Sequence, residues 1–250
     1  MFRKFNLTLL FFFLLISCER DSEFSNDPGD YNHTRSVGSS SNDLLNNSKY
    51  NALVIEILYM PGYAPDANAI SLVKNFLSTF LNKEGGISII QKEIAGASSS
   101  GLSAEEIRSI ENSNRTSFTS GSVMAVSIIY TNGQYSGNAN TLGIAYRNTS
   151  IALLGKTIHD NSGGFGQVSR TKLEATVLEH ELGHLLGLVD LGSQMQANHK
   201  DTAHGNHCDN KNCLMYYASE TTDILGFLTT NNIPQLDSNC KADLKANGGK

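Results

Sequence analysis

Residues Thr171–Gly187 read TKLEATVLEHELGHLLG, and this stretch decides how the whole chain is interpreted. It predicts an apolar helix from about Thr171 to Leu186. Within that helix, His180 and His184 are four positions apart, so both imidazoles lie on one face and can bind one metal ion. Glu181 is the adjacent residue, angled to reach a water molecule on the metal rather than the metal itself.

This pattern favours Zn²⁺ and hydrolytic chemistry. Zinc held by three protein ligands keeps a fourth position for water and lowers the pKa of that water to roughly 7. Glu181 would take a proton as the water attacks a carbonyl and would pass it to the leaving amine. We therefore expect His180 and His184 to be metal ligands and Glu181 to be the general base.

The composition fits a globular protein and argues against several other classes. Apolar residues make up 40% of the 250 positions and charged residues 17%, which excludes wholesale disorder, collagen-like sequence and coiled coil. The formal charge is -5 without a basic cluster, so nucleic acid is not an expected partner. We expect a monomer that acts on a protein or peptide.

The amino terminus has the pattern of an export signal. Arg3 and Lys4 precede an apolar run from Leu7 to Ile16, which is too short to span a bilayer. Leu15-Ile16-Ser17-Cys18 resembles the lipobox of bacterial lipoproteins. Residues 1–17 are therefore predicted to be a signal peptide and Cys18 a lipidated membrane anchor, in the periplasm or on the cell surface. The alternative is an ordinary secretory signal with an incidental cysteine.

The remaining chain divides into a tether and one folded domain. Residues 18–48 are rich in Ser, Asn, Asp and Gly, which predicts a flexible tether. Residues 49–250 are predicted to form a mixed α/β domain. The expected strands are 52–59, 87–94, 123–130, 142–146 and 150–158. The expected helices begin at Asp66 (ending at Gly85-Gly86), at Ser103 and at Thr171, with closing helices at 223–228 and 233–244.

The glycine after the two histidines indicates which group of metallopeptidases the motif resembles. His180-Glu181-x-x-His184-x-x-Gly187 resembles the metzincin metallopeptidases, in which this glycine turns the chain so that a later residue returns to the metal. The third metzincin ligand is normally a histidine, and that position here holds Asp190. The resemblance implies a small mixed sheet, an active-site helix, a methionine turn and a closing helix.

Two interpretations of the third ligand remain open. In one, Asp190 itself binds zinc, as in the snapalysin-like peptidases, whose motif ends in Asp. In the other, His207-Cys208 and the following Cys213-x-Met215 resemble the archaemetzincin pattern after an insertion, and His207 is the ligand. The longer match favours His207. His199 and His204 fall inside the insertion and are expected to be exposed loop residues.

The same resemblance assigns several neighbouring residues. Met215 corresponds to the methionine turn beneath the metal, and Tyr217 to a tyrosine that can stabilise the transition state. Archaemetzincins hold a second zinc with four cysteines, a set that the mature domain lacks. A Cys208–Cys213 disulfide is therefore expected instead, with Cys240 unassigned.

Three functions fit these observations. The first is a membrane-anchored zinc endopeptidase, in which an extended substrate pairs with the predicted strand at 142–146. The second is a surface lipoprotein with a peptidase-like fold that serves as a non-catalytic binding module. The third is a metal-dependent hydrolase of another amide, such as one in the cell wall.

Overall fold

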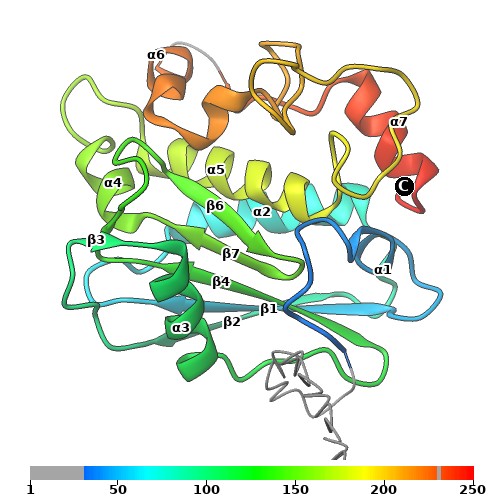
Figure 1. Ribbon diagram of the computed structural model, residues 1–250, viewed down its shortest axis with the longest axis horizontal. Coiled ribbons are helices and arrows are strands. Elements are labelled where there is room, and N and C mark those ends of the chain that lie inside the picture. Colours follow the sequence, from blue (N-terminus) through cyan, green and yellow to red (C-terminus); the bar gives the residue numbers. More distant parts are fainter. Residues whose placement is uncertain (1–30, 230–231) are drawn as a thin grey trace, which may run out of the picture.

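The computed structural model describes residues 31–229 and 232–250, and a five-stranded sheet lies at its centre (Figure 1). The strands of this sheet are β1 (Ala52–Tyr59), β2 (Ile87–Glu93), β4 (Val123–Tyr130), β6 (Gly143–Arg147) and β7 (Ser150–Leu153). Their order is β2-β1-β4-β7-β6. All neighbours are parallel except β6, which runs antiparallel to β7 at one edge. The predicted mixed α/β fold is confirmed.

Helices cover both faces of the sheet. Figure 1 shows α2 (Ala67–Phe80) and α5 (Arg170–Leu185) on one side and α3 (Ala104–Asn114) on the other. Strand β1 explains this arrangement, because its side chains alternate between the faces. Leu53, Ile55 and Ile57 join the apolar cluster that contains α2 and α5, whereas Leu58 joins the cluster that contains α3.

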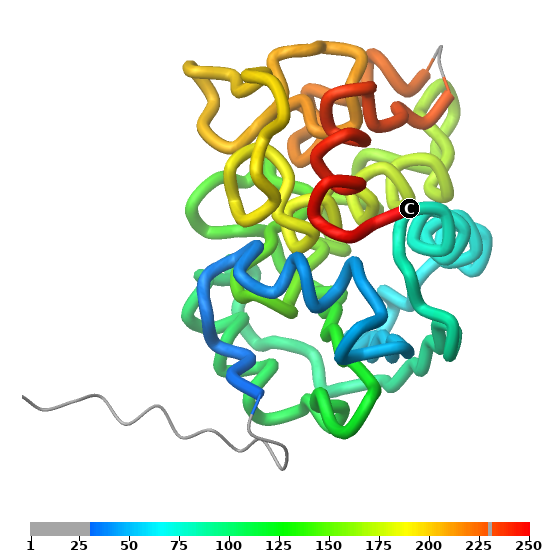
Figure 2. The backbone as a smooth tube through the Cα atoms, turned by 90° about the vertical axis from the view of Figure 1, so that its right-hand side faces the viewer, coloured from blue at the N-terminus to red at the C-terminus, as the bar shows by residue number. Residues whose placement is uncertain are grey.

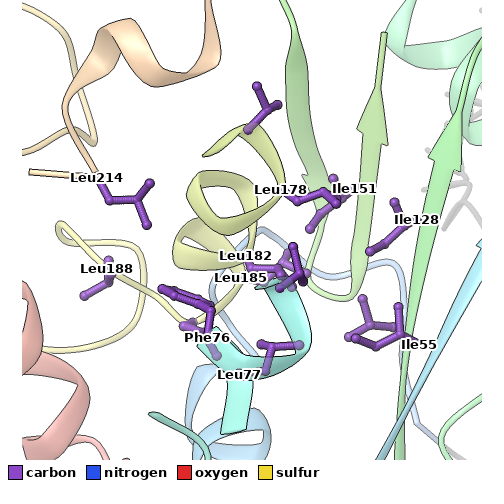
Figure 3. Packing of buried hydrophobic residues seen from close by; sticks show 14 of the residues in the cluster. Ile55, Phe76, Leu77, Ile128, Ile151, Leu178, Leu182, Leu185, Leu188 and Leu214 are labelled. Carbon is purple, nitrogen blue, oxygen red and sulfur yellow. The ribbon is translucent and has the colours of Figure 1, made fainter. Parts of the chain in front are cut away.

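The main core lies between α5, α2 and the sheet. Figure 3 shows Leu178, Leu182 and Leu185 of α5 near Leu77 of α2 and Ile151 of β7. Each aliphatic side chain buried in this way contributes about 1.5–3 kcal/mol relative to exposure. This packing holds α5, which carries the predicted metal ligands, rigidly against the sheet.

The predicted helix starts are confirmed by their caps. The Asp66 carboxylate accepts hydrogen bonds from the backbone N–H groups of Asn68 and Ala69 at the start of α2. Ser103 and Glu106 form both halves of a capping box at the start of α3. Helix α2 ends at Phe80, however, so its predicted end at Gly85-Gly86 is wrong. The apolar spacing that defined the helix also ends at Phe80.

The predicted strand at 150–158 is wrong in its second half. Strand β7 ends at Leu153, and α4 (Gly155–Asp160) follows. A Cβ atom at Gly155 would lie 2.6 Å from the carbonyl oxygen of Thr131, so only glycine permits this close turn. Ile158 is buried, as an apolar residue in a strand would be, but it lies in this helix. A short parallel pair, β3 (Gly101–Leu102) with β5 (Gln134–Tyr135), lies outside the main sheet.

Residues 31–48 belong to the folded body, which corrects the prediction that they form part of a flexible tether. This segment contains α1 (Ser41–Leu45), and Tyr31 is buried in the main core. Gly38 contacts the turn that follows α5, because a Cβ atom at Gly38 would lie 2.3 Å from the carbonyl oxygen of Leu191. The polar composition of the segment predicts a flexible tether because only a few of its residues are apolar, and those few make the buried contacts.

The predicted signal peptide, Cys18 and residues 18–30 of the predicted tether lie outside the described residues. Within the part of the chain that the structure describes, no helix has the length and apolar character needed to cross a membrane.

The carboxyl-terminal quarter covers one end of α5 and contains four short elements. These are η1 (Tyr217–Glu220), η2 (Thr222–Ile224), α6 (Leu225–Leu228) and α7 (Ser238–Ala246). The two predicted closing helices therefore exist, although the second begins five residues later than the sequence indicated. Figure 2 shows the chain end beside α2, where the backbone N–H of Lys250 donates to the carbonyl oxygen of Phe80 at 2.9 Å.

Candidate metal centre

Helix α5 positions the predicted ligands inside the protein. Its cap is Ser169, whose hydroxyl accepts a hydrogen bond from the backbone N–H of Lys172. Every residue from Leu173 to Leu185 is buried, including both histidines of the motif. Gly187 then adopts a φ of 78°, and this left-handed turn ends the helix.

Three histidines and one glutamate meet at the end of α5. The Nε2 atoms of His180 and His184 are 3.1 Å apart. His207 joins them from the segment that follows the insertion, and Glu220 joins them from η1. One ligand atom from each of the four residues lies within 4.8 Å of the others. The structure thus brings His207, and not Asp190, to the two helix histidines.

Hydrogen bonds turn the Nε2 atoms of two histidines toward a common point. His180 Nδ1 lies 2.8 Å from the carbonyl oxygen of Leu214, and His207 Nδ1 lies 2.6 Å from that of His204. A carbonyl can only accept, so each Nδ1 carries the proton and each neutral ring keeps a lone pair on Nε2. This is the orientation that a metal ligand requires.

Burial keeps the two helix histidines neutral. It lowers the pKa of His180 to about 4 and the pKa of His184 well below its ordinary value. His207 behaves differently: burial acts to lower its pKa, but the hydrogen bond and charge of Glu220 raise it overall. Neutral imidazoles have lone pairs available for a metal at neutral pH.

The residues fit a divalent cation. The Nε2 atoms of His180 and His184 are 3.1 Å apart, which is close to the spacing of two nitrogen ligands on one zinc ion. Nε2 of His207 is buried 3.5 Å from Glu220 Oε2, and both carboxylate oxygens of Glu181 are buried as well. A set of three imidazoles with a nearby carboxylate is typical of zinc sites.

Glu181 lies between the histidines and the edge strand β6. A Cβ atom at Gly143 would lie 2.9 Å from Glu181 Oε1 and 2.5 Å from Val177 Cγ1, so glycine at this position makes room for the carboxylate. Burial raises the pKa of Glu181 well above its ordinary value, and the charge of Glu220 adds to this. A bound dication would act in the opposite direction.

Met215 lies beneath the site. Its side chain is completely buried, and its carbonyl oxygen accepts a hydrogen bond of 2.8 Å from the backbone N–H of Cys208. This bond holds His207, the residue before Cys208, next to the methionine turn.

Asp190 and Tyr217 are not among the four residues whose ligand atoms meet at the end of α5. Asp190 is exposed, has a φ of 69°, and pairs with Lys200 Nζ at 2.9 Å. Tyr217 stacks on His204, with ring centroids 3.7 Å apart. Its ring therefore lies beside the loop that orients His207. His204 itself is exposed, as expected.

Sequence reasoning missed Glu220. Its Oε2 lies 3.5 Å from Nε2 of His207, 3.8 Å from that of His180 and 3.9 Å from that of His184. The residue lies five positions after Met215, outside the motif segments, and a single glutamate in a short loop carries no recognisable pattern.

A second candidate metal group contains His199, Cys208, Asp237 and Cys240, with one ligand atom of each within 4.8 Å of the others. The thiol of Cys213 adjoins this group. Cys208, Cys213 and Cys240 are all free thiols, so the predicted Cys208–Cys213 disulfide is wrong. The Sγ atoms of Cys213 and Cys240 are 3.6 Å apart. His199 Nδ1 lies 3.4 Å from Cys208 Sγ and 3.9 Å from Cys240 Sγ. The prediction that His199 is exposed is also wrong, because only 1% of its surface is accessible.

A buried carboxylate and the neighbouring thiols prepare this second group for metal binding. The buried carboxylate of Asp243 lies 2.8 Å from His199 Nε2, which orients the ring with Nδ1 toward the sulfurs. Hydrogen bonds from Cys208 and Cys240 lower the pKa of Cys213, which favours the thiolate form that binds a metal. Three cysteines and one histidine form a common ligand set for structural zinc.

The fold and the two ligand groups define the chain as a metzincin-type metallopeptidase. A profile of metallo-peptidase family M12 matches residues 1–228, and the chain belongs to that family. The chain is similar to the solved archaemetzincin from Methanopyrus kandleri, with 14% identity and a TM-score of 0.54, over 79% of this chain and 96% of that one. This likeness shows a shared fold.

A second solved structure is metalloproteinase-II from Bacteroides fragilis. It has 14% identity and a TM-score of 0.42, and the match covers 88% of this chain and 58% of that one. No curated protein matches the chain.

Proposed function

We propose that the chain is a zinc-dependent endopeptidase. The observation that carries this proposal is the convergence of His180, His184 and His207 next to the buried carboxylate of Glu181. The three histidines would hold the ion. Zinc bound there would polarise a peptide carbonyl and lower the pKa of a water molecule.

Glu181 would be the general base. Its buried carboxylate adjoins the proposed metal ligands, so it is placed to accept a proton from the attacking water. It would then give that proton to the amine of the departing product. Tyr217 remains a candidate for stabilising the transition state.

The edge of the sheet supports a peptide as the substrate. Strand β6 is the last strand of the order, and Gly143 at its start lies against Glu181. An extended peptide that pairs with the free edge of β6 would therefore run past the base and the metal ligands.

We also propose that Cys18 is lipidated after removal of residues 1–17 and anchors the protein to a bacterial membrane, in the periplasm or on the cell surface. The lipobox-like sequence supports this part of the proposal. We expect the folded body to be monomeric. Incorporation of radiolabelled palmitate into the wild type, and its loss in Cys18→Ala, would test the anchor.

A second zinc ion, with a structural role, is proposed at His199, Cys208, Cys213 and Cys240. Cys208 directly follows His207 in the chain, so this second ion would fix the segment that delivers a catalytic ligand. Structural sites of this type are closed by four protein ligands.

The experiment that tests the activity is hydrolysis of casein and of a peptide library by the purified folded body. We expect cleavage that stops with a zinc chelator and returns when zinc is added. A protein that binds zinc but cleaves neither substrate would instead support the non-catalytic binding module.

A further inference from the structure

The inference concerns Glu220 and rests on the proposed zinc site. An ion bound tetrahedrally at about 2.1 Å places its ligand atoms about 3.4 Å apart. Glu220 Oε2 lies 3.5 Å from His207 Nε2, 3.8 Å from His180 Nε2 and 3.9 Å from His184 Nε2. The distances from the carboxylate oxygen to the three imidazole nitrogens are therefore close to those between ligand atoms that share one tetrahedral ion.

The charges in the site agree with this geometry. The ion-pair contacts of Glu220 in the described part of the chain are all with these three histidines. Glu181 adds a second buried carboxylate beside the histidines. When both carboxylates are ionised, their combined charge matches that of one dication.

We propose that Glu220 is a fourth protein ligand of the metal in the resting protein and must leave the metal before water can bind. A site closed by four protein ligands has no position for the reacting water. Glu220 is suited to exchange because its side chain is 30% exposed and it ends the four-residue helix η1. Glu181, which is fully buried on the long helix α5, has no such freedom.

The backbone around Glu220 connects this exchange to the substrate strand. The Glu220 carbonyl oxygen accepts a hydrogen bond of 2.8 Å from the backbone N–H of Leu142, the residue before β6. Thr141 and Thr221 form an antiparallel bridge beside it. A peptide that adds to the free edge of β6 would therefore lie against the segment that carries Glu220, so substrate binding and release of the carboxylate are coupled.

The test measures metal binding directly, with Zn²⁺ and Co²⁺ as probes on the folded body. Zinc affinity is measured by competition with a chromophoric chelator, and coordination by the visible absorption of bound Co²⁺. We expect Glu220→Gln to lower affinity at the three-histidine site at least about tenfold and to change the Co²⁺ spectrum. His207→Ala is the positive control, because it removes an imidazole ligand.

Asp223→Asn is the matched control, because Asp223 is an exposed acidic residue three positions further along the chain. It should leave both measurements at the wild-type value. The melting temperature of the zinc-free protein shows whether Glu220→Gln folds. We expect it to match the wild type, since Glu220 is partly exposed.

An unchanged zinc affinity and Co²⁺ spectrum in folded Glu220→Gln would overturn the proposal. The proposal would also be overturned if Glu220→Gln kept the wild-type zinc affinity but, when saturated with zinc, turned over peptide more slowly. That result would indicate that Glu220 contacts the substrate and not the metal. Zinc affinity and the Co²⁺ spectrum are independent of peptidase activity. If the wild type cleaves no peptide, the proposed function is wrong. The assignment of Glu220 as a ligand is then still decided by the zinc affinity and the Co²⁺ spectrum.

Discussion

Gly183 and Met215 fit together so closely that a Cβ atom at Gly183 would lie 2.3 Å from Met215 Sδ. Glycine normally weakens a helix interior by about 1 kcal/mol relative to alanine. Its presence between His180 and His184 therefore has a packing reason: it lets Met215 pack closely against α5.

Gly183→Ala is expected to destabilise the protein by about 1–3 kcal/mol, because Met215 must leave its position. Urea unfolding of the two proteins measures this. Gly226→Ala is the matched control, since no atom lies within 4 Å of a Cβ built there. Equal stability of Gly183→Ala and the wild type would show that Met215 shifts without cost.

Glu181→Gln should reduce the rate of peptide hydrolysis by about 10²–10⁴-fold, because the amide cannot accept the proton. Zinc content should stay at the wild-type value, since the carboxylate is placed beside the ligands rather than among them. Activity and metal content are measured on the same preparation. Substantial residual hydrolysis would remove Glu181 from the mechanism.

His207→Ala should lower zinc affinity at the catalytic site at least about tenfold, because a direct ligand is lost. Asp190→Ala should leave it unchanged, because Asp190 is exposed and paired with Lys200. Chelator competition on both variants checks this. Loss of zinc from Asp190→Ala alone would support the other third-ligand interpretation.

His199→Ala should remove one of two bound zinc ions and lower the melting temperature, because a structural ion stabilises the state that binds it. Metal content per chain and thermal unfolding are the measurements. His204→Ala, an exposed histidine of the same loop, is the control. Loss of no metal from His199→Ala would contradict the second site.

Glu174 should make stability depend on pH. Burial raises its pKa from 4.5 to about 7, despite a hydrogen bond from the Asp66 backbone that lowers it. The folded state therefore holds the proton more tightly than the unfolded state. The contribution of Glu174 to stability is full below pH 4.5 and falls as pH rises to about 7, by about 3 kcal/mol.

Glu174→Gln removes this titration while keeping an oxygen that can accept from Asp66. The stability of the wild type relative to this variant should thus fall between pH 4.5 and pH 7. Denaturant unfolding at several pH values measures it. A constant difference across this range would show that Glu174 titrates normally.

Much of the fold was predictable because its signals are local. The caps at Asp66 and Ser103 fix helix starts through hydrogen bonds two or three residues away. The sequence predicts a strand over 150–158, but the strand ends at Leu153 and a helix follows. An apolar run predicts burial and does not distinguish a strand from a helix. The turn at Gly155 depends on the distant Thr131.

The site was predictable only where it lies on one helix. His180, Glu181 and His184 are set by helical geometry. Glu220 and His199 reach their groups through tertiary contacts, with partners up to 44 residues away along the chain in the case of His199 and Asp243. No spacing rule covers such a distance, so the sequence predicts that a lone histidine in a polar loop is exposed.

The packing of Gly38 against Leu191 also bears on how the enzyme should be produced. A recombinant fragment that starts at residue 49, the boundary suggested by composition, would lack the segment that covers the turn after the catalytic helix. Core side chains beneath Tyr31 and Leu44 would then face solvent, and such a fragment should aggregate during purification. A start at or before residue 31 retains that cover.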